Sequence, residues 1–394
     1  MLDSLATPRR QLVVLAIGVV LAMSPWFATS AVLGELRDRW EIGSLAASWL
    51  VITVQLGFVV GAALSASTGL ADRLGPNRLV LIGAIGAATA NALVVVGDDY
   101  RSALLFRGLT GACLALVYPP AMKSMSGWFA TGRGVALGTM VGALTLGSAL
   151  PHLVNALGGF GWVPTLLTIS ALTVLGGLVI DRLGGSGPHL GAPQPFDPRR
   201  IGMLVRLRSF RLATLGYFGH MWELYAMWAW IAVFAGDAVD SERGASLLAF
   251  AVIGVGAVGS VHAGRVSDER GRPLAARWAM SISGPAALVT GFLVDAPTLL
   301  VVAVALVWGY SVVADSAQFS TIVSEEVPAD SVGTALTVQL AAGFVLSVVT
   351  IFLVPAIRDA AGWGWAFALL APGPALGVWA MRRLEAATTV PPGS

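Results

Sequence analysis

Charged side chains are scarce in this chain. Only 12% of its 394 residues are Asp, Glu, Lys or Arg, whereas a soluble protein carries about 25%. Hydrophobic residues make up 56%, and the mean hydropathy is +0.79. This composition excludes an ordinary soluble protein and indicates an all-α polytopic membrane protein.

Cysteine, lysine and histidine are also rare. Cys113 is the single cysteine, so no disulfide framework is expected, and Lys123 is the single lysine beside 23 arginines. The net charge of +2 is small and implies no nucleic-acid partner. Four scattered histidines predict no metal cluster, and we expect no cofactor. We find neither His-Glu-x-x-His nor Gly-x-Ser-x-Gly, so we expect no catalytic residues and no enzyme.

Apolar runs of about 20 residues, the length of a membrane span, recur along the whole chain. Six come first, near residues 11–33, 45–70, 79–97, 101–122, 134–157 and 161–181. Six follow, near 209–236, 243–263, 277–296, 297–319, 331–356 and 362–381. The first run resembles a secretory signal, but a retained first helix is the better interpretation because the rest of the chain is also membrane.

The spans predict two six-helix bundles, 1–181 and 209–394, joined by a polar linker at 182–208. With the N-terminus inside the cell, the segments that face the cytoplasm hold 18 basic residues and the opposite segments hold five. This asymmetry predicts a multi-pass protein of the cell inner membrane with both termini in the cytoplasm.

A charged turn occurs once in each half. The first copy reads Asp72-Arg73-Leu74-Gly75-Pro76-Asn77-Arg78, and the second reads Asp268-Glu269-Arg270-Gly271-Arg272. Both resemble the Gly-x-Leu-Ala-Asp-Arg-x-Gly-Arg-Arg loop between helices 2 and 3, and again 8 and 9, of the major facilitator superfamily. In the first copy, Thr68 and Pro76-Asn77 depart from that pattern. Arg107-x-x-x-Gly111 resembles a second signature of the same family.

This resemblance implies a twelve-helix carrier that works by alternating access around a midplane cavity. The Gly-Pro pair of drug:proton antiporters is missing from the fifth span, which reads Gly147-Ser148-Ala149-Leu150-Pro151. The stretch from Tyr118 to Gly138 is similar to the uptake branches that carry small anions. Nitrate is not expected, because the second and eighth spans lack membrane arginines.

The charged turns are candidates for a cytoplasmic gate. Asp72 would face the N-terminus of the eleventh helix at Ser331, and Asp268 would face the start of the fifth, near Arg133, as carboxylates near helix N-termini are stabilising. The alternative is that the turns only fix topology. The gate candidates are Asp72, Arg73, Gly75, Arg78, Asp268, Arg270, Gly271 and Arg272.

Charges inside a membrane span point to function. His220 and Glu223 lie three residues apart, so they share one face of the seventh helix. An imidazole beside an acid can exchange protons near neutral pH, although the two could instead form a static hydrogen-bonded pair. Asp315 is either a second proton site or a satisfied residue near the cytoplasmic mouth.

The remaining candidates would line the substrate cavity. Arg107 could bind an anionic substrate or pair with a carboxylate of its own half. Aromatic residues of the seventh helix could select a ring-bearing solute, or simply pack against neighbours and lipid. The cavity candidates are Arg107, His152, Asn155, Tyr217, Trp222 and Tyr225.

The sequence therefore predicts a monomeric transporter whose partners are a small molecule, protons and the lipid bilayer. We expect proton-coupled uptake (symport) of a small organic solute, and the family resemblance implies an anion. The alternatives are a proton-driven exporter of drugs or amphiphilic metabolites and a transport-inactive membrane receptor.

Overall fold

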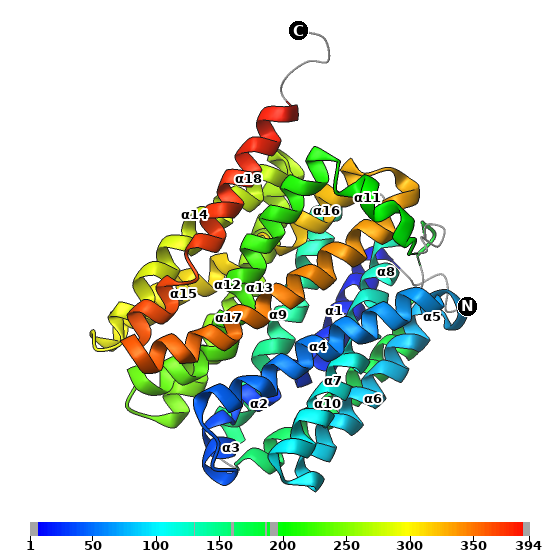
Figure 1. Cartoon of the computed structure of the whole chain (residues 1–394). Helices are drawn as coiled ribbons and strands as arrows, with labels where there is room; N and C mark the ends of the chain where they lie inside the picture. The colour runs from blue at the N-terminus through cyan, green and yellow to red at the C-terminus, as the bar shows by residue number, and fades with distance from the viewer. Residues whose placement is uncertain (1–6, 130, 159–160, 186, 190–195, 389–394) are drawn as a thin grey trace.

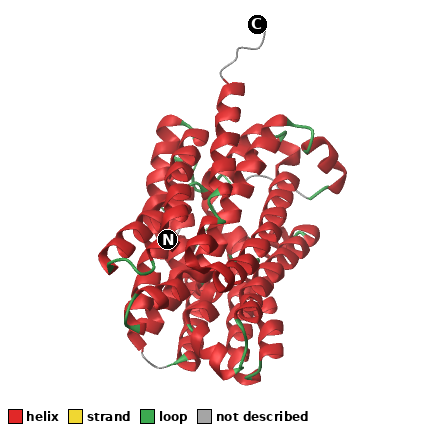
Figure 2. Ribbon diagram, turned by 60° about the vertical axis from the view of Figure 1, so that its left-hand side comes forward, coloured by secondary structure: helices red, strands yellow, loops and turns green. Residues whose placement is uncertain are grey.

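The computed structural model is a bundle of long helices, and every regular element of the described chain is helical (Figure 2). It describes residues 7–129, 131–158, 161–185, 187–189 and 196–388, with the side chains at positions 71, 72, 329, 387 and 388 outside the described part.

The first half of the chain contributes the blue to green helices of Figure 1. Its elements are α1 (Pro8–Ala22), the 3-10 turn η2 (Ser24–Phe27), α2 (Ala28–Ala31), α3 (Leu33–Arg39), α4 (Ser44–Thr68), α5 (Leu70–Leu74), α6 (Pro76–Gly97), α7 (Tyr100–Leu114), α8 (Tyr118–Ser126), α9 (Arg133–Gly158) and α10 (Trp162–Leu183).

The second half contributes the green to red helices. Its elements are η3 (Pro198–Arg200), α11 (Ile201–Leu204), α12 (Arg208–Ala238), α13 (Glu242–Arg270), α14 (Arg272–Thr290), η4 (Gly291–Leu293), α15 (Thr298–Val312), α16 (Ser316–Glu326), η5 (Ala329–Ser331), α17 (Val332–Ala368) and α18 (Pro372–Thr388).

Twelve crossings account for these helices, as predicted. Nine stretches of the described chain are long and apolar enough to cross a bilayer. The last of them, Val332–Ala386, holds two crossings, because Gly362 breaks α17 with φ 81° and ψ 174°. The more polar α12 and α14, of 31 and 19 residues, complete the twelve.

The two charged turns have the same backbone shape. Gly75 (φ 76°) separates α5 from α6, and Gly271 (φ 95°) separates α13 from α14. A positive φ is readily adopted only by glycine, so each turn needs a glycine at this position. Each following helix begins with a proline at its first turn, Pro76 or Pro273, where a missing backbone N–H is tolerated.

The halves meet along two pairs of helices, α9 with α13 and α4 with α17, which lie side by side in Figure 1. Small residues permit the close approach of α9 and α13. A Cβ atom added to Gly138 would lie 2.4 Å from the Ser260 backbone oxygen, and one added to Gly264 would lie 2.4 Å from that of Gly134. Side chains at these positions would force the halves apart.

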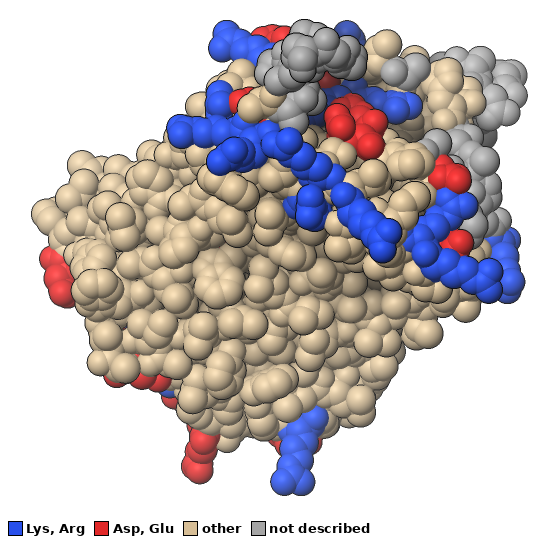
Figure 3. Space-filling model, turned by 45° about the horizontal axis from the view of Figure 1, so that its top comes forward, with Lys and Arg blue, Asp and Glu red and all other residues tan. Residues whose placement is uncertain are grey.

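Basic side chains gather at one end of the molecule. Figure 3 shows Lys and Arg concentrated there, while the broad middle is almost free of charge. This end, which we call the basic face, carries the start of α1, both charged turns, η3 with α11 and the end of α18. The uncharged middle is the part that suits a lipid environment.

Candidate functional site

Four aromatic rings fill the centre of the interface between the halves. Trp26 and Phe58 come from η2 and α4, and Tyr225 and Phe344 come from α12 and α17. Ring centroids lie 4.8 Å apart for Trp26 and Phe58, 5.0 Å for Phe58 and Phe344, and 5.0 Å for Tyr225 and Phe344. All four side chains are buried. This central aromatic cluster joins the halves through ring contacts alone, so it can separate without breaking a hydrogen bond.

Arg107 fixes the break in the first crossing that carries Trp26. Pro25 lacks a backbone N–H, and the first crossing changes there from α1 to the 3-10 turn η2. Arg107 donates to the Pro25 oxygen at 2.9 Å and to the Trp26 oxygen at 2.5 Å. It also donates to Asn91 Oδ1 at 3.2 Å. The expected carboxylate partner is therefore wrong for the described chain: Arg107 is buried and bonded to carbonyl oxygens.

Several buried polar groups lie beside the central aromatic cluster without a partner in the described chain. Gln55 lies three residues before Phe58 on α4, and its amide is unpaired. The Trp26 and Trp228 indole N–H groups are also unpaired, and the Trp228 ring lies 5.8 Å from the Tyr225 ring. Buried polar atoms normally have partners, so these groups have hydrogen-bonding capacity that the described chain does not use.

The two candidates on α9 differ in their surroundings. His152 is fully buried, and both ring nitrogens lack a partner in the described chain. Asn155, three residues on, donates to the Ala31 backbone oxygen at 2.9 Å and to Ser246 Oγ at 3.1 Å. Asn155 thus links the first half to α13, whereas His152 is free to bond a ligand.

His220 and Glu223 do not bond each other. His220 Nδ1 lies 2.7 Å from Asp315 Oδ1, while Glu223 accepts bonds from Trp308 Nε1 at 2.7 Å and from Ser283 Oγ at 2.9 Å. The hypothesis of a direct His220–Glu223 pair is therefore wrong for this structure.

Asp315 has a partner, which leaves both interpretations of it open. It lies at the break between α15 and α16 and is buried beside His220. The second half thus holds three buried titratable side chains, two on α12 and one at the start of α16, whereas Arg107 and His152 of the first half lie on different helices.

The other aromatic candidates on α12 point in different directions. Tyr225 joins the central aromatic cluster. Tyr217 packs on His220 and Phe319, with ring centroids 6.1 and 6.2 Å away. Trp222 donates to the Leu369 backbone oxygen at 2.9 Å, so it packs inside the second half rather than in the cluster.

The sequence interpretation missed most of the cluster. Trp26, Phe58 and Phe344 lie in apolar runs, where a ring that faces lipid and a ring that faces a partner helix have the same pattern. Two signals were available: the Ser24-Pro25 break inside the first span, and Gln55, an amide within an apolar run.

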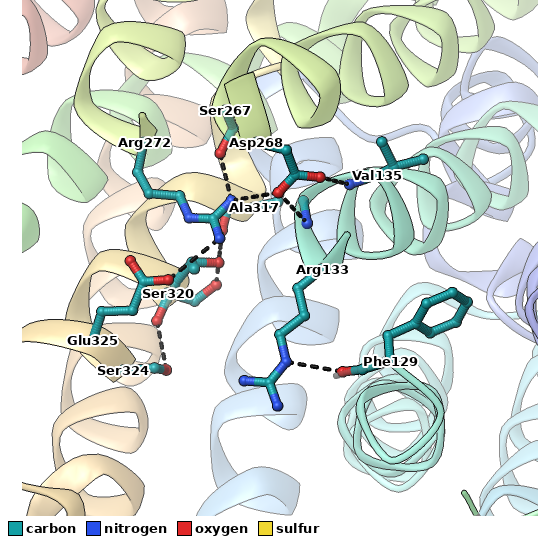
Figure 4. Close-up of polar contacts among 12 residues, drawn as sticks. Phe129, Arg133, Val135, Ser267, Asp268, Arg272, Ala317, Ser320, Ser324 and Glu325 are labelled. Atoms are coloured by element: carbon teal, nitrogen blue, oxygen red, sulfur yellow. Dashed lines mark hydrogen bonds and ion pairs between the residues drawn. The ribbon is translucent and has the colours of Figure 1, made fainter. Parts of the chain in front are cut away.

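Asp268 joins the two halves at the basic face. Its Oδ1 accepts from the Gly134 backbone N–H at 2.9 Å, and its Oδ2 accepts from that of Val135 at 3.1 Å. Figure 4 shows its carboxylate between the start of α9 and Arg272. Arg272 lies 3.3 Å from Asp268 and 3.3 Å from Glu325. The carboxylate thus lies at the positive end of the α9 dipole, where pseudo-symmetry put it.

The first charged turn is arranged differently. Arg78 Nη1 lies 3.7 Å from Asp181 Oδ2 of α10, inside the same half. Arg73 and Arg270 are exposed, and the side chain of Asp72 lies outside the described part. Ser331 occupies the N-cap position of α17, but its side chain makes no cap bond and its Oγ instead accepts from Arg200 Nη1 at 2.9 Å.

Comparison with known proteins agrees with this architecture. The sequence model of the Major Facilitator Superfamily matches residues 15–351. The multidrug efflux pump LfrA of Mycolicibacterium smegmatis is 31% identical over 209 residues, 50% of this chain and 40% of that protein.

Two further relatives are also transporters by name. Monocarboxylate transporter 11 of Mus musculus is 29% identical over 199 residues, 47% of this chain and 42% of that protein. The MFS transporter asaE of Aspergillus flavus is 27% identical over 213 residues, 52% and 47% of the two chains. The matched region spans less than half the length of each of these relatives. Since the family match covers most of the chain, the protein belongs to the Major Facilitator Superfamily of membrane transporters.

Proposed function

We propose that the protein is a secondary active transporter that takes up a small, ring-bearing organic anion together with protons. The observation that carries this proposal is the set of unpartnered donors beside the central aromatic cluster. An indole N–H can only donate, and an amide and a neutral imidazole each offer donors as well. Trp26, Trp228 and Gln55 therefore suit an acceptor-rich solute such as a carboxylate, and the unpaired imidazole of His152 on α9 offers a further donor.

Arg107 adds to this preference. Its charge is buried in the first half, and it has no carboxylate partner in the described chain. Because Arg107 bonds the Trp26 backbone oxygen, its positive charge lies next to the cluster. A buried cation raises the local preference for negative charge, and the rings supply flat apolar surfaces for the solute's ring.

The way in which the halves meet supports transport by alternating access. The central aromatic cluster closes the middle, and Asp268 closes the basic face. A solute at the centre would replace the ring contacts between the halves. The halves would then tilt relative to each other about the close contact of α9 with α13. The two charged turns would act as the gate. Its residues would be Asp72, Arg73, Gly75 and Arg78 in the first half and Asp268, Arg270, Gly271 and Arg272 in the second.

The buried titratable side chains of the second half would carry the protons. Glu223, His220 and Asp315 lie on α12 and at the start of α16, next to the crossings that must move. One charge moved through 100 mV gives about 2.3 kcal/mol, which corresponds to about a fiftyfold solute gradient. A single proton site is therefore sufficient for useful accumulation.

Transport in proteoliposomes tests the proposal. Organic anions selected by a thermal-shift screen should accumulate when the outside is acidified. Glu223→Gln should remove that accumulation while solute exchange at equal pH persists, and Glu242→Gln, at the exposed start of α13, should behave as wild type. Accumulation by Glu223→Gln equal to wild type would remove Glu223 from the coupling, and absence of exchange with any solute would favour an inactive receptor.

A proton-driven exporter is the second candidate. The aromatic walls also suit amphiphilic, uncharged molecules, and one relative is a multidrug efflux pump. Everted membrane vesicles separate the two directions. Solute that enters such vesicles under a proton gradient indicates export, whereas solute that enters right-side-out vesicles indicates uptake.

The orientation belongs to the same proposal. The basic face would lie in the cytoplasm with both termini, since basic residues favour that side. The proposal also includes the cell inner membrane as the location and a monomer as the transporting unit.

A further inference from the structure

A groove lies on the outer surface of the second half, close to the basic face. It has a volume of about 600 Å³ and lies between α13 and α15. Its apolar part is lined by Ala257, Val258 and Val261, and its polar end by His262, Arg265 and Tyr310. Val258 is 62% exposed, so the groove opens outward rather than toward the centre of the transporter.

The side chains at the polar end of the groove are held in place by contacts with one another. Tyr310 and His262 are hydrogen-bonded through the hydroxyl and Nδ1. The Trp278 ring from α14 lies 5.2 Å from the His262 ring and 6.2 Å from the Tyr310 ring. The helices α13 and α15 pack closely beside the groove, because a Cβ on Gly259 would clash with the Tyr310 backbone oxygen. The groove is therefore shaped before any ligand arrives.

Arg265 supplies the charge of the groove. It is exposed, and it forms no ion pair among the described residues. The nearest acid in sequence, Asp268, is already engaged by α9 and Arg272. An unpaired guanidinium at the polar end of an apolar groove suits a phosphate that is attached to an apolar tail.

The depth of the groove fits the same ligand. His262 lies eight residues before the end of α13, about 12 Å at 1.5 Å per residue. Tyr and Trp rings are typical of this level, where headgroups meet acyl chains. Arg265, closer to the basic face, lies where a lipid phosphate is expected, and Val258 lies where its acyl chain begins.

From this geometry we infer that the groove binds the headgroup of an anionic phospholipid from the leaflet at the basic face. Arg265 pairs with the phosphate, the His262–Tyr310 pair offers a hydrogen bond to the headgroup, and Ala257, Val258 and Val261 contact the acyl chain. The solute site at the centre of the molecule is a separate place, so this inference does not depend on which solute is carried or on the direction of transport.

Native mass spectrometry of the full chain in detergent tests the inference. Phosphatidylglycerol and phosphatidylcholine with the same acyl chains are added separately, and bound lipids are counted. Wild type should retain more phosphatidylglycerol. Arg265→Gln should reduce that preference about fivefold, the effect of one basic residue at an anionic surface. Arg265→Lys should keep most of it.

The matched control is Arg211→Gln. Arg211 is also an exposed arginine near the basic face, but it lies outside the groove, so its loss should leave the preference unchanged. Thermal unfolding in the same detergent verifies that the variants are folded. Equal lipid binding by Arg265→Gln and wild type would overturn the inference, and so would equal losses in both variants. Equal retention of the two lipids would also overturn the inference and would indicate a groove that binds acyl chains only. Full competition by inorganic phosphate would overturn it as well and would indicate a site for free anions.

Discussion

Arg107 shows how one buried charge can be held without an opposite charge. Its guanidinium reaches carbonyl oxygens from Pro25, Trp26 and Leu50 and the side chain of Asn91. Unpaired polar groups would be costly inside a membrane, and the break in the first crossing offers the guanidinium two backbone oxygens, those of Pro25 and Trp26. A planar group with five donors can serve several acceptors at once, which an ammonium on a flexible stem does less well.

Replacement of Arg107 by lysine should therefore destabilise the first half. A lysine keeps the charge but leaves at least one of these acceptors unpaired, and each buried unpaired group costs about 1–3 kcal/mol. We expect a loss of about 2 kcal/mol in the free energy of unfolding, measured by denaturant titration in detergent. Arg101→Lys, at an exposed site on the same helix, is the control. Equal stability of the two variants would show that Arg107 does not hold the break.

Individual site residues were only partly predictable. Charge in an apolar run marked Arg107, Glu223 and Asp315 correctly as buried, because such residues are rare in membrane spans. Their partners could not be predicted, since helical spacing relates residues on one helix only. His220 is close to Glu223 in sequence, yet its partner Asp315 comes from a different helix.

At the scale of elements, the described part of the linker from residue 196 onward is folded and binds the start of α17, and we call this contact the clamp. The predicted polar stretch at 182–208 contains the short helical elements η3 and α11. Arg200 Nη1 lies 2.5 Å from Asp330 Oδ2 and bonds Ser331 Oγ at 2.9 Å, while the Asp197 N–H donates to Thr334 Oγ1 at 2.9 Å. These contacts hold the linker on the start of α17, one of the helices that line the interface between the halves.

The clamp should depend on pH through Asp330. The hydrogen bond from Arg200, followed by that from Ser331, lowers the pKa of this carboxyl below its ordinary value. A group with a lowered pKa in the folded state stabilises the fold above its unfolded pKa. That stabilisation is lost as the pH falls through the folded pKa, here below about pH 4.

Thermal unfolding of Asp330→Asn across a pH series measures this dependence. At neutral pH the variant should melt below wild type, and the difference should shrink to nothing in acid. Because the pair is exposed, added salt should also reduce the difference. Arg200→Gln should give the same profile, and the double variant should add nothing. A difference that stays constant with pH would assign the effect to something other than the ion pair.

Whole elements were more predictable than their interruptions. All twelve crossings follow from apolar length, because a helix must span about 30 Å of hydrocarbon whatever its partners. Breaks inside a crossing depend on local backbone chemistry. The break in the first crossing could be predicted from Pro25. The break at 313–315 between α15 and α16 could not, because these three residues include no proline or glycine.

At the scale of the whole molecule, the contact of Asp268 with α9 connects the two halves at the basic face. A carboxylate at a helix N-terminus contributes about 0.3–2 kcal/mol, depending on burial. This corresponds to about a 2- to 30-fold change in the ratio of two conformations. The central aromatic cluster has no comparable hydrogen bonds, so the basic face is where a small change should shift the balance.

Asp268→Asn should therefore open the basic face more often. The amide removes the charge that the α9 dipole and Arg272 stabilise, while its size is almost unchanged. Ser260→Cys, which replaces a buried serine on α13 at the contact with Gly138, provides a labelling site in a Cys113→Ser background. Its labelling by a water-soluble thiol reagent should rise by about 2- to 30-fold in Asp268→Asn. Glu269→Gln, the neighbouring exposed acid, should leave labelling unchanged. If both variants label like wild type, Asp268 only shapes the turn, and closure of the basic face rests on helix packing alone.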